Sequence, residues 1–214
     1  MVAYSKADKF FTVEEKERLK AAVHGVESRT IGEIVVMVVD RSDHYIEAEV
    51  LGGILFGSLL SLIVAFLYLH SSLWSYVPLS FLLFFPCRFL FQKIDVMKRP
   101  LIGIKRREES VRLRAERAFF EKGLYKTKKY TGVLFFLSLF ERKVWVLADK
   151  GIYAKMDQET LNRFANEVSR GIREGRACEA LSQAIQEIGI LLSKHFPVTP
   201  DDTDELPDDV MTEE

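Results

Sequence analysis

The sequence has few of the features that mark disulfide-bonded, exported or nucleic-acid-binding proteins. Two cysteines in 214 residues are too few for a disulfide framework and fit a reducing compartment. Thirty Lys and Arg residues against 31 Asp and Glu residues leave a net charge of -1. So balanced a chain lacks the basic surplus that non-specific binding of nucleic acid requires. The first twelve residues carry no apolar run behind their basic residues, so a cleavable signal peptide is not expected.

Sequence motifs of common catalytic sites are also missing. The chain has no P-loop, no G-x-G-x-x-G after a strand, no G-x-S-x-G and no H-E-x-x-H. Its four histidines are far apart, and none lies near a cysteine at zinc-site spacing. No nucleophile–histidine–acid triad follows from such a pattern, which makes catalysis the less favoured interpretation.

Two long apolar runs are the strongest positive feature of the sequence. The first, Val50 to Leu69, contains no charge, and a helix of its length spans about 30 Å of hydrocarbon. The second extends from about residue 73 to 91, and its one charged residue, Arg88, is close enough to the end to reach the membrane interface. Residues 50–92 are therefore predicted to form a transmembrane hairpin with helices at about 50–69 and 73–91.

The charges around the hairpin predict its orientation. The connecting segment, residues 70–75, carries no Lys or Arg, whereas the second run leads into a strongly basic segment. The positive-inside rule places that segment, and with it both termini, on the cytoplasmic side of the membrane. The same cations suit anionic lipid headgroups, so the bilayer is an expected partner. They are Arg88, Lys93, Lys98, Arg99, Lys105, Arg106 and Arg107.

Small residues recur every four positions along the first apolar run, at Gly53, Gly57, Ser61 and Ala65. Such a stripe lets another helix approach closely. The approaching helix is either the second helix of the same hairpin or a second membrane protein, including another copy of the chain. The sequence leaves both alternatives open.

The flanking segments predict an α/β domain that the hairpin interrupts after its first strand. A capping box at Thr12 and Glu15 starts a helix, and residues 34–39 are a continuous β-branched run typical of a strand covered on both faces. After the hairpin come a helix at 105–122, a strand hairpin at 132–148 and two amphipathic helices.

We expect three layers with a mixed sheet, in which the strands before and after the insertion run parallel. The domain then consists of residues 1–49 and 93–197. The acidic segment 198–214 is expected to be a disordered tail, with partner binding as the alternative.

Acidic residues at the ends of the predicted strands are the candidate metal ligands. Asp40 follows the first strand, Glu141 lies at the tip of the strand hairpin and Asp149 follows the third strand. Ligand sites of parallel sheets gather at the carboxyl ends of strands, where Asp40 and Asp149 could hold Ca²⁺ or Mg²⁺ through oxygen ligands. The competing interpretation is that these are solvated acids, which are common at strand ends.

The sequence also resembles the TPM domain family, whose name derives from a thylakoid-lumen acid phosphatase, a photosystem II accessory protein and a modulator of a nematode acetylcholine receptor. The resemblance rests on three stretches in the order found here, and the hairpin after the first strand resembles a membrane-bound bacterial subgroup. The stretches are FFTVEEKERLKAAVHGVESRTIGEIVVMVVDRSDHYIEAE, RAFFEKGLYKTKKYTGVLFFLSLFERKVWVLADKGI and ALSQAIQEIGILLSKHFP.

The resemblance implies helices packed on a small mixed sheet and two kinds of function. One is metal-assisted phosphatase chemistry, and the other is the assembly or maintenance of membrane complexes. Many relatives carry an acidic pair before the Arg of the strand hairpin, where this chain has Phe140 and Glu141, and its Ala148 to Ile152 replaces a Gly-Tyr-Gly-like turn. Because these departures fall near the candidate metal ligands, we expect a non-catalytic, membrane-tethered interaction module, with a cation-dependent phosphomonoesterase as the alternative.

Overall fold

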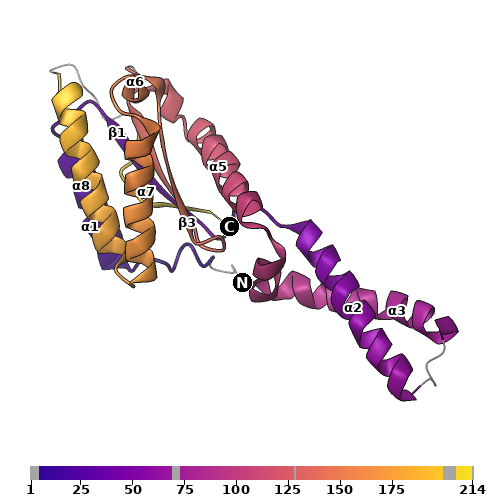
Figure 1. Ribbon diagram of the computed structural model, residues 1–214. Helices are drawn as coiled ribbons and strands as arrows, with labels where there is room; N and C mark the ends of the chain where they lie inside the picture. Colours follow the sequence, from indigo (N-terminus) through magenta and orange to yellow (C-terminus); the bar gives the residue numbers. More distant parts are fainter. Residues whose placement is uncertain (1–4, 69–72, 128, 200–205, 214) are drawn as a thin grey trace. The chain divides into compact units, whose positions relative to one another are not determined.

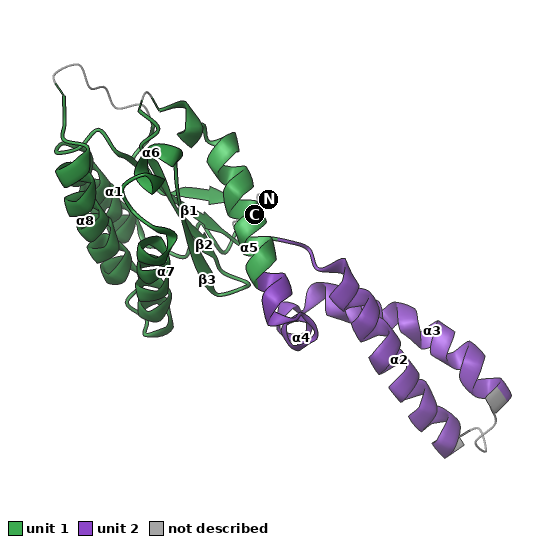
Figure 2. Ribbon diagram, turned by 45° about the horizontal axis from the view of Figure 1, so that its top comes forward, with its two compact units in different colours: residues 1–42, 108–214 green, residues 43–107 purple. Residues whose placement is uncertain are grey.

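The computed structural model describes residues 5–68, 73–127, 129–199 and 206–213. The chain divides into two compact units, one of residues 1–42 and 108–214 and one of residues 43–107 (Figure 2). The units therefore meet at 42/43 and 107/108, whereas the sequence placed the hairpin boundaries at 49/50 and 92/93. Residues on both sides of the apolar runs belong with the hairpin because ion pairs join them, as described below.

The first unit is built on a four-stranded sheet with the order β3-β2-β1-β4. β1 runs parallel to β2 and to β4, and β2 runs antiparallel to β3. The predicted mixed sheet and the parallel pairing across the insertion are both confirmed. The strands are β1 Glu33–Val39, β2 Gly132–Ser138, β3 Lys143–Ala148 and β4 Met211–Glu213.

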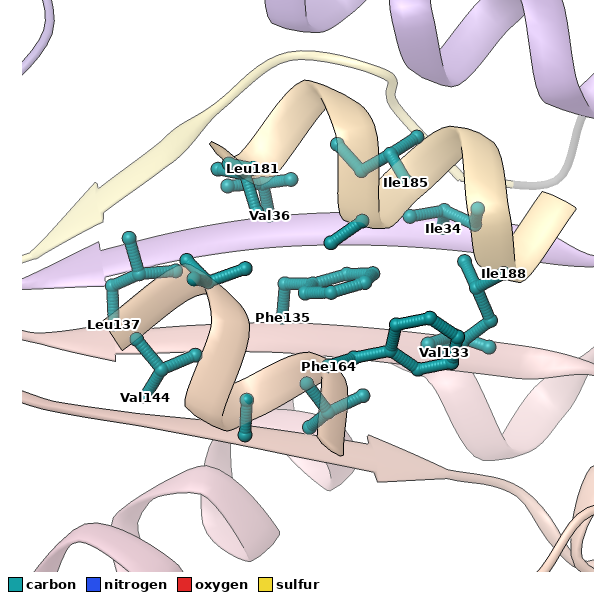
Figure 3. Packing of buried hydrophobic residues seen from close by; sticks show 14 of the residues in the cluster. Ile34, Val36, Val133, Phe135, Leu137, Val144, Phe164, Leu181, Ile185 and Ile188 are labelled. Carbon is teal, nitrogen blue, oxygen red and sulfur yellow. The ribbon is translucent and has the colours of Figure 1, made fainter. Parts of the chain in front are cut away.

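Helices cover both faces of this sheet, which confirms the three layers (Figure 1). α1, α7 and α8 pack on one face and α5 on the other, because alternate residues of each strand point to opposite faces. Ile34 of β1 and Phe135 of β2 point to the first face (Figure 3), and Val35 points to the second. The helices are α1 Val13–Glu27, α5 Ile104–Glu121, α6 Lys150–Tyr153, α7 Gln158–Arg173 and α8 Ala177–His195, with a 3-10 turn η2 at Leu124–Lys126.

Local sequence signals set the helix ends. The predicted capping box is present, since Thr12 Oγ1 accepts from Glu15 N at 3.2 Å and Glu15 accepts from Thr12 N at 2.8 Å. Asp157 starts α7 by accepting from Thr160 N at 2.8 Å. These contacts satisfy backbone N–H groups that have no partner within the helix.

The acidic tail is partly ordered, which corrects the prediction of disorder over 198–214. Residues 200–205 and 214 lie outside the described part of the chain, but Met211–Glu213 forms β4, with Met37 opposite Met211. The carboxylate of Glu213 contacts Arg114 and accepts from Lys122 Nζ at 2.7 Å. Acidic residues that would otherwise stay solvated are thus held by backbone pairing and by cations of the domain.

The second unit is a helical hairpin. α2 Ile46–Tyr68 and α3 Leu73–Lys93 are followed by the short helix α4 Asp95–Lys98 and a 3-10 turn η1 at Arg99–Leu101. Within Ile46–Leu67 and Trp74–Lys93, the most apolar 18-residue windows have mean hydropathies of 2.5 and 1.4, so both helices are long and apolar enough to cross a membrane. Only 28% and 6% of these two windows are buried, unlike the core helices of soluble proteins.

The stripe of small residues in α2 packs against α3 of the same hairpin. A Cβ atom on Gly53 would lie 2.9 Å from Arg88 Cβ, and one on Gly57 would lie 3.1 Å from backbone atoms of Phe84. Ser61 and Ala65 are buried as well. The structure therefore uses the stripe for close packing within the hairpin, the first of the two alternatives that the sequence left open.

Candidate functional site

Asp40, the first predicted metal ligand, lies at the carboxyl end of β1 and holds the N-terminal segment. Its carboxylate accepts hydrogen bonds from Lys6 N at 3.1 Å and from Ala7 N at 2.6 Å. Its carbonyl oxygen accepts from Phe140 N at 2.9 Å, which places the segment after β2 next to it. The fold thus brings Asp40 and the residues around Glu141 together at the carboxyl ends of β1 and β2.

Glu141 is buried at this end of the sheet with 3% of its surface exposed. One carboxylate oxygen accepts from Ser42 N at 3.0 Å, and the other accepts from the hydroxyl of Ser138. The hydroxyls of Ser42 and Ser138 lie 2.9 Å apart. Glu141 therefore ties the segment leaving β1 to the end of β2, a role that the sequence did not predict.

Asp149 lies at the opposite end of the strands from Asp40, just after β3 and beside the start of β2. Its backbone N–H donates to Gly132 O at 2.9 Å, at the start of β2, and its carboxylate caps α6 by accepting from Lys150 N at 2.6 Å. At about 3.3 Å per residue, the length of β2 separates it from Asp40 by about 20 Å. The prediction that Asp40 and Asp149 approach one another is wrong, because β3 is antiparallel to β2 and ends beside the start of that strand.

The three predicted ligands therefore do not form one metal site. Over the described stretches of the chain, no group of three or more His, Cys, Asp or Glu side chains is arranged to hold an ion. Asp40 and Glu141 stay predicted ligands near the carboxyl ends of β1 and β2, although the sequence did not pair them with each other. Both carboxylates already accept hydrogen bonds from the protein.

The structure contains a cavity of about 530 Å³ beside β3 that was not predicted from the sequence. Four cations and two carboxylates line it, with Lys143 Nζ donating to Glu108 at 2.7 Å. Its charged residues come from α5, the turn between β2 and β3, β3 and α7, so no local motif could have revealed it. The charged lining residues are Glu108, Glu109, Arg112, Arg142, Lys143 and Arg173, and the others are Val111, Val144, Trp145, Asn162, Ala165, Asn166 and Ser169.

Glu27, at the end of α1, faces other carboxylates in a buried setting. One of its oxygens accepts from Ile34 N at 2.8 Å, and the other faces the carboxyl group of Asp208. Burial raises the pKa of Glu27 to about 9, and the charges of Glu33 and Asp208 contribute to the rise against the hydrogen bond from Ile34. At neutral pH Glu27 keeps its proton and can donate it to Asp208, which joins α1 to the segment before β4.

Ion pairs hold the base of the hairpin unit. Lys98 Nζ lies 2.8 Å from the carboxylate of Glu49, and both side chains are buried. Arg106 contacts Asp43 at 2.5 Å and Glu47 at 3.0 Å. Burial acts to raise the pKa of Asp43, but the hydrogen bonds from Arg106 and from the backbone of His44 and Tyr45, together with the charge of Arg106, outweigh it and the pKa is lowered. These pairs explain why the unit begins and ends outside the apolar runs.

Comparison with known proteins agrees with this architecture. The family model of the TPM domain matches residues 102–190. This chain carries a TPM domain. The solved structure of the BA42 protein from the psychrophilic bacterium Bizionia argentinensis is similar over 97% of this chain and 99% of its own, with a TM-score of 0.61 and 21% identity. That likeness concerns the fold, and no curated protein matches the sequence.

An aromatic side chain lies next to Glu141 in the TPM domain of this chain. Phe140 is buried with 6% of its surface exposed, directly before Glu141. Asp40 is an acid that lies close to Phe140, because Phe140 N donates a hydrogen bond to the carbonyl oxygen of Asp40.

Proposed function

We propose that this protein is a membrane-tethered interaction or complex-maintenance module whose TPM domain does not act as a catalyst. The observation that carries the proposal is the hairpin of two exposed, apolar helices, which forms a unit separate from the TPM domain. An anchor of this kind restricts a domain to the membrane surface and raises its effective concentration toward membrane partners.

The proposed orientation places both termini on the cytoplasmic side of a bacterial inner membrane. Its support is the asymmetry of charge, since the basic segment follows α3 and the connection between the helices carries no Lys or Arg. Residues 69–72 of that connection lie outside the described stretches. Cysteine labelling from either side of sealed vesicles tests the orientation, with Ser75→Cys expected to react from the outside and Ser193→Cys from the cytoplasmic side.

The bilayer itself is the first proposed partner, and a membrane protein is the second. Since α3 covers the stripe of small residues, association with another membrane helix is proposed to use the lipid-exposed sides of the hairpin. Leu62 and Phe81 are examples, with 57% and 73% of their surfaces exposed. Packing there would be driven by van der Waals contact rather than by the small-residue motif.

Replacing Leu62 by arginine should release the protein from membranes. A cation near the middle of a span costs about 2.5–3.5 kcal/mol on insertion scales. The matched control is Leu113→Arg, because Leu113 is similarly exposed, at 51%, but lies on α5 outside both candidate spans. Alkaline extraction of membranes followed by detection of the protein makes the comparison. Equal retention of the two variants would contradict the proposed anchor.

A cation-dependent phosphatase is the alternative function, and the shared position of Asp40 and Glu141 at one end of the sheet favours it. Such an enzyme would use the ion to polarise a phosphoryl group and to activate water. We expect purified protein to hydrolyse a generic phosphate ester no faster than buffer, with or without Mg²⁺ or Ca²⁺. Turnover that requires the cation and disappears in Asp40→Asn would establish the alternative.

A further inference from the structure

The cavity beside β3 lies entirely within the first unit, between α5 and α7. α7 starts near the end of β3, because Tyr153 of α6 donates to Gln158 at 2.8 Å, and it then runs back along the strand (Figure 1). Its last turn therefore comes close to the start of β3, where Arg173 lines the cavity together with Arg142 and Lys143. A volume of about 530 Å³ is within the range of pockets that bind small molecules.

One stripe of α7 presents hydrogen-bonding side chains to the cavity and, among its lining residues, no carboxylate. Its members are spaced four, three and four residues apart, which places them on one side of the helix. They are Asn162, Asn166, Ser169 and Arg173. Apolar side chains from α5, β3 and α7 complete the lining, at Val111, Val144, Trp145 and Ala165. The cavity thus combines an apolar part with donors of hydrogen bonds.

The charged part of the lining has a positive surplus. Four cations line the cavity against two carboxylates, Glu108 and Glu109, which leaves two positive charges in excess. Glu108 already accepts from Lys143 Nζ at 2.7 Å. Arg142 and Arg173, in contrast, form neither an ion pair nor a side-chain hydrogen bond with any residue that the structure describes. Two guanidinium groups therefore remain available to an anion in the cavity.

Arg142 occupies its place in the turn between β2 and β3 against a backbone preference. Its φ of 53° lies in the left-handed region, which glycine adopts freely and which a residue with a Cβ atom adopts only at a cost. Backbone strain of this kind persists mainly at functional sites. The side chain at this strained position has no partner in the described fold, so an external ligand is the partner that it lacks.

We propose that this cavity binds a small organic dicarboxylate. One carboxylate would accept hydrogen bonds from Arg142 and Arg173, since the planar guanidinium fork matches a carboxylate. Asn166 and Ser169 would donate to the rest of the polar part, and the hydrocarbon chain would lie against the apolar side chains. A dianion matches the surplus of two positive charges. This site goes beyond the proposed interaction function, because it requires neither the hairpin nor a protein partner.

An organic anion fits this lining better than other kinds of occupant. A metal ion would meet the positive surplus, and so would a second copy of the chain that presented the same cavity. Inorganic phosphate or sulfate would satisfy the arginines but would leave the apolar side chains in contact with water. A dicarboxylate with a short hydrocarbon chain covers both parts of the lining.

Trp145 allows binding to be measured directly, because it lines the cavity and the only other tryptophan, Trp74, lies in α3. The full chain with Trp74→Phe, in detergent micelles, is titrated with succinate and with adipate, which differ in length. At least one should change the fluorescence saturably, with a Kd of about 1 mM or lower that rises with salt. Adipamide, which is similar in shape but uncharged, should bind at least about tenfold more weakly. If neither acid gives a saturable change, or if adipamide binds as well as adipate, the proposal is wrong.

Arg142→Gly separates binding from folding. Glycine suits the left-handed backbone, so this variant should unfold about 2 °C higher while it binds the acid less tightly. Combined with Arg173→Ala, the loss of affinity should reach about tenfold or more. Arg170→Ala is the matched control, because Arg170 is exposed on α7 but does not line the cavity, and it should stay within about twofold. Unchanged affinity in the double variant, or an equal loss in Arg170→Ala, would contradict the site.

Competition separates an organic acid from a simple oxyanion. Phosphate and sulfate should displace the bound acid only at concentrations about tenfold higher than its own, because they cannot cover the apolar lining. Displacement at equal concentration would overturn the assignment to an organic acid. Since every lining residue belongs to the first unit, these results do not depend on the outcome of the anchoring test with Leu62→Arg.

Discussion

Replacing Phe135 by alanine should lower the free energy of unfolding of the TPM domain by about 4 kcal/mol, a typical cost for removing a buried aromatic ring. Phe135 is fully buried on β2, and its ring lies among side chains from the neighbouring strand and from the helices above it (Figure 3). Neighbours held in both sheet and helices cannot collapse into the vacated space without moving backbone. Denaturant unfolding of the full chain in detergent, followed by tryptophan fluorescence, measures the loss.

The control for Phe135 is a phenylalanine of equal size on the surface of the same domain. Phe120 lies on α5 with 62% of its surface exposed and contacts the ring of Tyr125 at 5.5 Å between centroids. Its replacement by alanine should cost no more than about 1 kcal/mol. Similar losses for the two variants would mean that the central cluster does not govern the stability of the domain.

The fold was predictable where one physical signal dominated a segment. The continuous β-branched run before Asp40 predicted a strand buried on both faces, and β1 packs against helices on both. Thr12 and Glu15 predicted the start of α1 through a local contact that needs no tertiary information. The apolar runs likewise predicted two long helices from composition alone.

The prediction that Asp40 and Asp149 share a metal site was wrong because it ignored the direction of β3 in the sheet. The sequence predicted a strand hairpin with Glu141 at its tip, and a hairpin necessarily reverses the chain. Asp149 therefore had to end up beside the start of β2, far from Asp40, as the bond to Gly132 O shows. The error lay in grouping strand ends by their order in the sequence rather than by their direction in the sheet.

The ordered tail and the β3 cavity could not be predicted in the same way. β4 is only three residues long and carries no strand pattern, and its order depends on pairing with β1 and on contacts with Arg114 and Lys122 that lie about a hundred residues earlier. An acidic composition predicts disorder only when the folded domain offers no cations that can pair with the carboxylates of the segment. The cavity likewise exists only once α5, β3 and α7 are assembled.

The stability of the TPM domain should fall as pH rises from about 5 to about 9, because of Glu27. Burial raises the pKa of Glu27 from its ordinary value of 4.5 to about 9. Between these values the unfolded chain has released the proton that the folded protein keeps, so a higher pH favours unfolding. The slope attributable to this one group is at most about 1.4 kcal/mol per pH unit and ends above pH 9, where both states are ionised.

Glu27→Gln should remove this contribution to the slope, because glutamine stays neutral and keeps the same size. The variant should unfold at the same temperature as the wild type near pH 4.5 and at a higher temperature at pH 8. At pH 8 the unfolded wild-type chain gains free energy by releasing the proton of Glu27, whereas glutamine has no proton to release. Glu17→Gln, at an exposed position of α1, is the control and should follow the wild-type curve. Hydrogen exchange at β4 should report the same change, because the shared proton joins α1 to the segment around Asp208 that leads into the strand. Parallel curves for wild type and Glu27→Gln across this range would mean that Glu27 is ionised in the folded domain and that the contact with Asp208 does not hold the strand.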